Sequence, residues 1–140
     1  MAKIVFCEDE KLLQKLICRI LRSMSHEVYV ASNGLAGLVL IEHEHPDLIL
    51  TDISMPGCDG FQLADAVKAQ PYLASIPIVF VTAFAQRYDV EEGARHGAAG
   101  YLVKPFSAAE LRAMIETALI PHGECDVGGK DESTLYTEKP

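Results

Sequence analysis

Residues 48–57 read LILTDISMPG, an apolar run that ends on the carboxylate of Asp52 and then breaks at a Pro-Gly turn. The segment from Asp47 to Thr51 has the composition of a buried strand. It therefore predicts that Asp52 lies at the carboxyl end of that strand, where the chain leaves the sheet. In open α/β sheets, ligands bind at this edge. Asp52 is thus the first candidate for a functional side chain.

The rest of the chain alternates between short apolar runs and segments with helical spacing. Further strands are predicted over residues 3–7, 27–31, 76–81 and 100–103. Helical spacing is clearest in residues 12–24 and 107–119. Nearly continuous apolar strands that alternate with helices indicate a parallel sheet with helices on both faces. The predicted fold class is α/β, a flavodoxin-like doubly wound five-stranded parallel sheet in the order 2-1-3-4-5.

Local signals predict where helices begin and end. Asn33 is expected to cap the second helix, and Gly97 is expected to end a helix over residues 84–96. Ser107 and Glu110 have the spacing of a capping box. In the first helix one apolar stripe is predicted from Leu12, Leu13, Leu16, Ile17, Ile20, Leu21 and Met24. The basic residues beside it are interpreted as a solvated face rather than a docking surface: Lys11, Lys15, Arg19 and Arg22.

Length and composition fit one globular domain. The chain has 140 residues, of which 49% are hydrophobic and 23% charged, enough for a sizeable core. The formal net charge of -8 argues against direct nucleic-acid binding by this domain, because such binding needs a basic face. No apolar run approaches the about 20 residues that cross a bilayer, so no membrane association is expected.

The cysteines and the two ends of the sequence give the remaining expectations. Four cysteines without C-x-x-C spacing favour free thiols in a reducing, cytoplasmic location. The acidic residues 8–10 argue against a signal peptide. From Pro121 the chain is rich in Gly, Ser, Thr and charge. The expected organisation is therefore a folded domain over residues 1–120 and a flexible tail or truncated linker over 121–140.

Polar side chains follow four of the five predicted strands. They are Glu8 and Asp9, Asp52, Thr82, and Lys104. Each alone is ordinary, since an Asp after a strand is usually a turn or capping residue. Together they matter, because parallel strands bring their carboxyl ends to one edge of the sheet. These side chains are therefore expected to converge.

The chemistry of this set points to a phosphoryl group and a metal ion. Three nearby carboxylates repel one another unless a cation is present, and Mg²⁺ suits a site with few protein oxygens and several waters. A hydroxyl on Thr82 and an ammonium on Lys104 suit the oxygens of a transferred phosphoryl group. Asp52 could then act as the nucleophile and become an acyl phosphate.

Taken together, these residues resemble the receiver domains of two-component response regulators, the CheY-like proteins. The likeness runs from about Lys3 to Leu119 and rests on Glu8-Asp9, Asp52 with Met55-Pro56-Gly57, Asp59-Gly60, Thr82-Ala83, Gly97-Ala98 and the run YLVKPF at 101–106. The resemblance implies a signalling switch rather than an enzyme, catalysing only its own phosphorylation and dephosphorylation. It implies phosphotransfer to Asp52 from a histidine kinase or a histidine phosphotransfer protein.

The same resemblance implies a role for each residue. Asp9, Asp52 and the backbone carbonyl of Ser54 would ligate Mg²⁺, and Glu8 would hold a metal-bound water. Thr82 and Lys104 would contact the phosphoryl oxygens, and the Lys104–Pro105 peptide would be cis. Tyr101 would be a switch whose ring turns inward when Thr82 moves. The changed face, made by the fourth helix, fifth strand and fifth helix, would bind a downstream protein partner or an output domain outside this sequence.

Two positions depart from the family pattern, and alternatives remain open. Many members have Asp where this chain has Glu8. Members of one DNA-binding subfamily often have two Asp where this chain has Ala99-Gly100, and they use these acids for salt bridges across a dimer. That mode of dimerisation is therefore less expected here. Without the resemblance, Tyr101 would be interpreted as a surface aromatic. A Mg²⁺-dependent phosphatase would need an acid at position 54, which is Ser54. A receiver that no longer accepts phosphate would usually lack one of the acidic or lysine residues.

Overall fold

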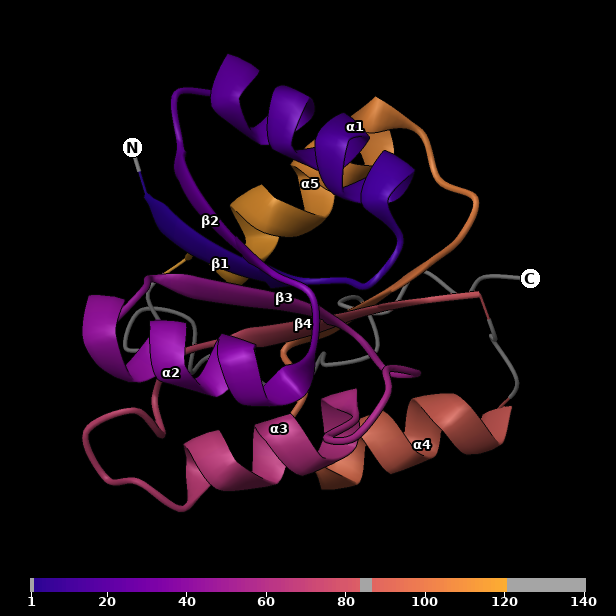
Figure 1. The fold of residues 1–140 in the computed structure, drawn as a ribbon. Helices are drawn as coiled ribbons and strands as arrows, with labels where there is room; N and C mark the ends of the chain where they lie inside the picture. Colours follow the sequence, from indigo (N-terminus) through magenta and orange to yellow (C-terminus); the bar gives the residue numbers. More distant parts are fainter. Residues whose placement is uncertain (1, 84–86, 121–140) are drawn as a thin grey trace.

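The computed structural model describes residues 2–83 and 87–120. Strands and helices alternate along this part of the chain, and Figure 1 shows their arrangement. The strands are β1 (Lys3–Cys7), β2 (Glu27–Ala31), β3 (Leu48–Asp52), β4 (Ile78–Thr82) and β5 (Gly100–Val103). The helices are α1 (Lys11–Ser23), α2 (Gly34–Glu44), α3 (Gly60–Lys68), α4 (Arg87–Arg95) and α5 (Ala108–Ala118).

The five strands form one parallel sheet in the order β2-β1-β3-β4-β5, which confirms the predicted fold. Helices α1 and α5 cover one face, and α2, α3 and α4 cover the other (Figure 1). All five positions of β3 and of β4 are buried. Helices cover both faces of these strands, so both sets of alternating side chains must be apolar. This accounts for the continuous apolar runs in the sequence.

Strand alternation divides the core into two clusters. Ile4 and Phe6 of β1 point into the cluster beneath α1 and α5, whereas Val5 and Cys7 point into the cluster on the opposite face. Edge strand β2 follows the same rule, with Val28 on the first side and Ala31 on the second. The two layers of helices therefore pack on opposite faces of one sheet.

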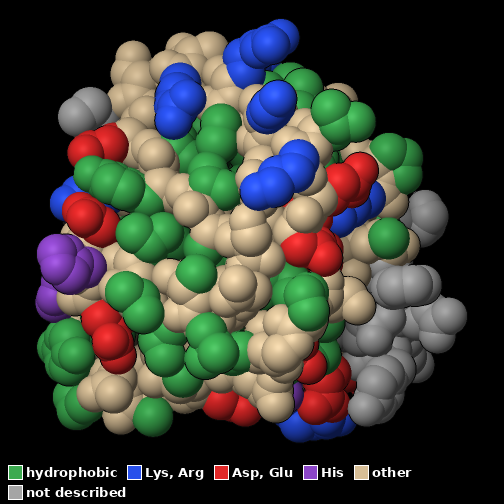
Figure 2. Space-filling model, viewed as in Figure 1, with side chains coloured by type: hydrophobic (Ala, Val, Ile, Leu, Met, Phe, Trp, Pro, Cys, Tyr) green, Lys and Arg blue, Asp and Glu red, His purple; other side chains and the backbone are tan. Residues whose placement is uncertain are grey.

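The prediction of a single stripe on α1 was partly wrong. Leu12 and Leu16 are 75% and 51% exposed, whereas Ile17, Cys18 and Leu21 are buried. Successive helical residues are rotated by about 100°, so Leu12 and Leu16 lie on the flank of the face that meets the sheet. The four basic residues of α1 are all exposed, and Figure 2 shows basic side chains gathered over this helix at the top of the view.

The capping predictions are confirmed. The Asn33 side chain accepts a hydrogen bond from the Ala36 amide at 2.8 Å. Ser107 and Glu110 form the reciprocal capping box of α5. Gly97 follows α4 with a φ of 85°, a conformation that favours glycine.

Several element boundaries differ slightly from the prediction. Strand β3 includes Asp52, and β4 begins after Pro77 rather than at Ile76. Part of the helix predicted over 84–96 and the tail predicted over 121–140 lie outside the described residues. Within the described ranges, no helix is both long and apolar enough to cross a bilayer.

Candidate functional site

The predicted polar residues come together at the carboxyl edge of the sheet. Glu8 and Asp9 follow β1, and Asp52 and Thr82 end β3 and β4. Asp52 lies opposite Val81 in the strand pairing, and Thr82 lies opposite Val103, the residue before Lys104. The parallel register therefore brings these residues to one edge of the sheet, although they are far apart in the sequence.

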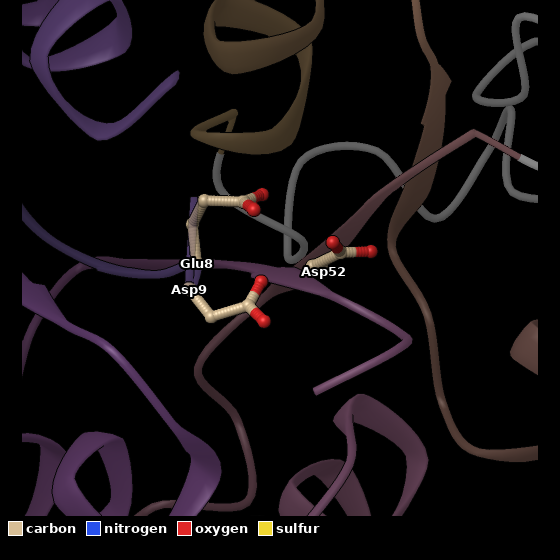
Figure 3. Close-up of side chains that lie close together, drawn as sticks. All are labelled: Glu8, Asp9 and Asp52. Atoms are coloured by element: carbon tan, nitrogen blue, oxygen red, sulfur yellow. The ribbon is translucent and has the colours of Figure 1, made fainter. Parts of the chain in front are cut away.

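Glu8, Asp9 and Asp52 form an acidic cluster. One carboxylate oxygen from each lies within 4.8 Å of the others, and Figure 3 shows the three side chains close together at the ends of β1 and β3. Glu8 and Asp52 are buried, with 1% and 7% exposure, whereas Asp9 is exposed. Hard carboxylate oxygens in this arrangement fit the Mg²⁺ that the resemblance implies, with Asp9 open to solvent for entry of the ion.

Lys104 is the cation of the site. Its Nζ lies 3.2 Å from Oε1 of Glu8 and 3.2 Å from Oδ2 of Asp52. Burial by itself would lower the pKa of Lys104, but the charges of Asp52 and Glu8 outweigh it and raise that pKa. Lys104 therefore stays protonated. Ionised, the three carboxylates exceed its single charge, which leaves the cluster attractive to a divalent cation.

The buried carboxyl of Glu8 interacts with protein groups rather than with solvent. Burial is the largest effect on this carboxyl and raises its pKa, and the nearby charge of Asp52 acts in the same direction. The Glu10 amide donates a hydrogen bond to its Oε2 at 3.1 Å, and Lys104 opposes the rise. The Gln14 side-chain amide donates to the Glu8 backbone carbonyl. Glu8 thus has a fixed geometry but an energetically costly charge.

Asp52 is fixed by its own strand and by the start of α3. The Ser54 amide lies 3.4 Å from its Oδ1, and the Thr51 hydroxyl donates to its backbone carbonyl at 2.9 Å. A Cβ at Gly60 would lie 2.3 Å from that same carbonyl oxygen. Only glycine therefore allows α3 to begin so close to the phosphoacceptor candidate.

Thr82 and Lys104 are joined through the backbone. The Lys104 amide donates to the Thr82 carbonyl at 2.8 Å, and Thr82 is 1% exposed. The Lys104–Pro105 peptide is cis, as the resemblance implied. Ser54 lies exposed in the segment after β3.

Tyr101 points into the core rather than onto the surface. Its side chain is fully buried, and its ring packs against Phe80 with centroids 6.4 Å apart at 65°. A Cβ at Gly93 of α4 would lie 3.2 Å from its Cε2. The interpretation of Tyr101 as a surface aromatic is therefore wrong. The sequence offered no signal that Gly93 makes room for this ring.

A domain with this sheet, an acidic cluster at its carboxyl edge and a lysine directly after the last strand is a CheY-like receiver. Residues 4–116 match the family described as "Response regulator receiver domain". The chain belongs to this family, whose members act as switches in two-component signalling and interact with kinases and downstream partners.

Some relatives match this chain over nearly their whole length, and others over about half of it. Protein PilH of Pseudomonas aeruginosa is 34% identical over 119 residues, which cover 85% of this chain and 98% of PilH. Chemotaxis protein CheY-3 of Vibrio cholerae is 31% identical over 81% of this chain and 88% of its own length. The probable transcriptional regulator ycf27 of Porphyra purpurea is 33% identical over 84% of this chain. The chain spans about half the length of that regulator, 47%.

Solved structures agree with the fold. The chemotaxis protein CheY4 of Vibrio cholerae superposes with a TM-score of 0.82 at 29% identity, over 85% of this chain and 99% of CheY4. The receiver domain of sensor histidine kinase PA1611 from Pseudomonas aeruginosa gives a TM-score of 0.79 at 30% identity, over 84% and 97% of the two chains. The latter structure is described with a magnesium ion coordinated in the active-site cleft.

Proposed function

We propose that Asp52 is the phosphoacceptor of this receiver domain and that a phosphohistidine on a histidine kinase or phosphotransfer protein is the donor. The observation that carries the proposal is the contact of Lys104 Nζ with both Asp52 and Glu8 at 3.2 Å. This contact places the Lys104 ammonium beside Asp52. Within the acidic cluster, Asp52 is the only carboxylate that ends a fully buried strand.

The transfer exchanges one phosphorus bond for another. A carboxylate oxygen of Asp52 attacks the phosphorus, and the bond from phosphorus to the donor imidazole nitrogen breaks. The freed imidazole keeps the electron pair of that bond and takes up a proton from solvent. Lys104 remains charged throughout and stabilises the negative charge on the transferred oxygens. Thr82 would offer its hydroxyl to the same oxygens.

Glu8, Asp9, Asp52 and the backbone carbonyl of Ser54 are the groups that would hold Mg²⁺, with Glu8 acting through a water. When bound, the ion supplies positive charge that offsets the repulsion between the carboxylates and the incoming phosphoryl group. The acidic cluster and the magnesium described for the similar PA1611 receiver support this assignment.

Phosphorylation would act on the face made by α4, β5 and α5. The Tyr101 ring is already buried against α4, so the phosphorylated state would hold this orientation rather than create it. Thr82, drawn to the phosphate, would stabilise the packed arrangement of the neighbouring strand and helix. A downstream protein or an output domain that binds this arrangement would shift the population toward it.

Intact mass spectrometry after incubation with acetyl phosphate tests the site. We expect one phosphoryl adduct on the wild type in the presence of Mg²⁺ and none on Asp52→Ala. Asp47→Asn is the matched control, because Asp47 precedes the same strand at its opposite end. An adduct that persists in Asp52→Ala would overturn the assignment, and steady turnover of a generic phosphoester would instead indicate a phosphatase.

A further inference from the structure

His96 lies between two carboxylates that belong to different helices. It follows the last residue of α4. Its Nδ1 is 2.6 Å from Oδ1 of Asp65 on α3, and its Nε2 is 3.1 Å from Oε2 of Glu92 on α4. The ring stacks on Phe61 of α3, with centroids 4.7 Å apart and planes at 15°. His96 therefore joins the end of α4 to α3 through two contacts, with Asp65 and Phe61, and is held to α4 itself by Glu92.

The number of protons on the ring decides how strong this junction is. An imidazolium donates from both nitrogens and can satisfy both carboxylates. A neutral imidazole has one N–H, so one carboxylate would face a lone pair. The hydrogen bond to Asp65 is the largest effect and raises the pKa of His96; partial burial opposes it, and Glu92 adds to the rise. The geometry and the charges thus favour the doubly protonated ring.

Two charged side chains near the junction, Arg95 and Lys68, have partners other than the imidazole. Arg95 pairs with Glu92 through the other carboxylate oxygen, Oε1. The Lys68 stem packs against Gly97, but its ammonium donates to the carbonyls of Ala74 at 2.9 Å and Ile76 at 3.4 Å. Among the described residues, the carboxylates of Asp65 and Glu92 are therefore the groups that face the imidazole directly.

A row of rings connects this junction to Tyr101. Phe61, which stacks on His96, packs edge-on against Phe80 at 5.2 Å, and Phe80 packs against Tyr101 at 6.4 Å. Gly93 precedes His96 by about one helical turn, and a Cβ there would lie 3.3 Å from Phe80 and 3.2 Å from Tyr101. The segment of α4 that covers Tyr101 is thus the segment that His96 secures.

We propose that protonated His96 is a pH-dependent clasp that fixes the end of α4 to α3 and so holds α4 over Tyr101. The clasp closes at low pH and loosens as the pH rises through the titration of His96 in the folded protein. This adds proton dependence to the position of a helix, independently of whether Asp52 is phosphorylated.

The titration of His96 can be followed by NMR on the whole unphosphorylated chain without Mg²⁺. We expect its midpoint to lie above that of an ordinary histidine and to fall in Asp65→Asn, which keeps the ring but removes the strongest partner. The NMR signals of exposed His43 on α2 serve as the internal control and should be the same in both proteins. A His96 midpoint at or below the ordinary value, or one unmoved by Asp65→Asn, would overturn the proposal.

Amide hydrogen exchange shows whether the clasp holds the helix. After correction for the intrinsic pH dependence, wild-type protection over residues 91–96 should fall about two- to fivefold between pH 6 and pH 9, the range expected for loss of a partly exposed ion pair. In His96→Gln the protection should be low and independent of pH, and in the control His43→Gln it should follow the wild type. Equal pH dependence in wild type and His96→Gln would contradict the clasp. If His96→Gln fails to fold, Asp65→Asn supplies the same comparison.

Discussion

Lys104 Nζ lies 3.2 Å from Oδ2 of Asp52, so a residue that follows β5 reaches the end of β3 across the intervening strand β4. The same ammonium reaches Glu8 beyond β1 at 3.2 Å. One lysine therefore connects the ends of strands on both sides of the sheet centre. Its removal leaves two buried carboxylates facing each other.

The first prediction concerns this lysine. Lys104→Met keeps most of the side-chain volume but removes the charge, so without Mg²⁺ the free energy of unfolding should fall by about 1–2 kcal/mol. Added Mg²⁺ should restore more stability to Lys104→Met than to the wild type, because the ion replaces the missing charge. Urea unfolding with EDTA or with Mg²⁺ measures both effects. Equal stabilisation of the two proteins by Mg²⁺ would show that Lys104 does not balance the cluster.

The second prediction concerns Glu8 and pH. Its raised pKa means that the folded protein binds this proton more tightly than the unfolded chain does. Glu8 thus contributes stability below its ordinary pKa, and that contribution is lost as the pH rises through the higher pKa of the folded state. Glu8→Gln mimics the protonated form and should make the Mg²⁺-free protein more stable at pH 7.

The same substitution should weaken the response to Mg²⁺, because an amide is a poorer ligand partner than a carboxylate. Glu10→Gln, at an exposed position beside the site, is the control and should leave both properties nearly unchanged. Unfolding measured against pH in EDTA, and then against Mg²⁺ at pH 7, gives the two results. A Glu8→Gln protein that is less stable at pH 7 would contradict the inferred cost of this charge.

The third prediction concerns the contact between α4 and Tyr101. Gly93→Ala gains about 1 kcal/mol of helix propensity, but its Cβ would press on the rings of Tyr101 and Phe80 at 3.2 and 3.3 Å. Overpacking of this kind costs about 1–3 kcal/mol, so the net change should be a loss. The NMR shifts of Tyr101 and Phe80 should also move.

Ala94 provides the matched position on the same helix. It is exposed, so Ala94→Gly should cost only the propensity difference of about 1 kcal/mol and should leave the ring shifts unchanged. A stabilised Gly93→Ala protein with unaltered ring signals would show that a Cβ at position 93 fits beside the two rings without a clash.

The fourth prediction concerns the two faces of α1. Leu16 is 51% exposed and Leu21 is fully buried. Leu21→Ala should lower the free energy of unfolding by about 2–5 kcal/mol, because it leaves a cavity in the core. Leu16→Ala should change it by about 0.5 kcal/mol or less. Denaturant unfolding of the two variants distinguishes them, and similar losses would mean that Leu16 is packed in solution.

The sequence by itself determined the order and type of the elements and the placement of Glu8, Asp9, Asp52, Thr82 and Lys104 at one edge of the sheet. These are consequences of local patterns. An apolar run specifies a buried strand, a cap specifies a helix start, and parallel strands must deliver their carboxyl ends to one edge. Given the fold class, the residues at the carboxyl ends of the strands identify the site.

Tertiary structure alone decided which flank of α1 faces solvent, where Tyr101 points and which partners His96 meets. The spacing of α1 could not settle how the helix is rotated on the sheet, which left Leu12 and Leu16 outside the core. Tyr101 is buried because Gly93, on a different element, leaves room for its ring. His96 and Asp65 are 31 positions apart, and only the packing of α4 beside α3 brings the imidazole to the carboxylate.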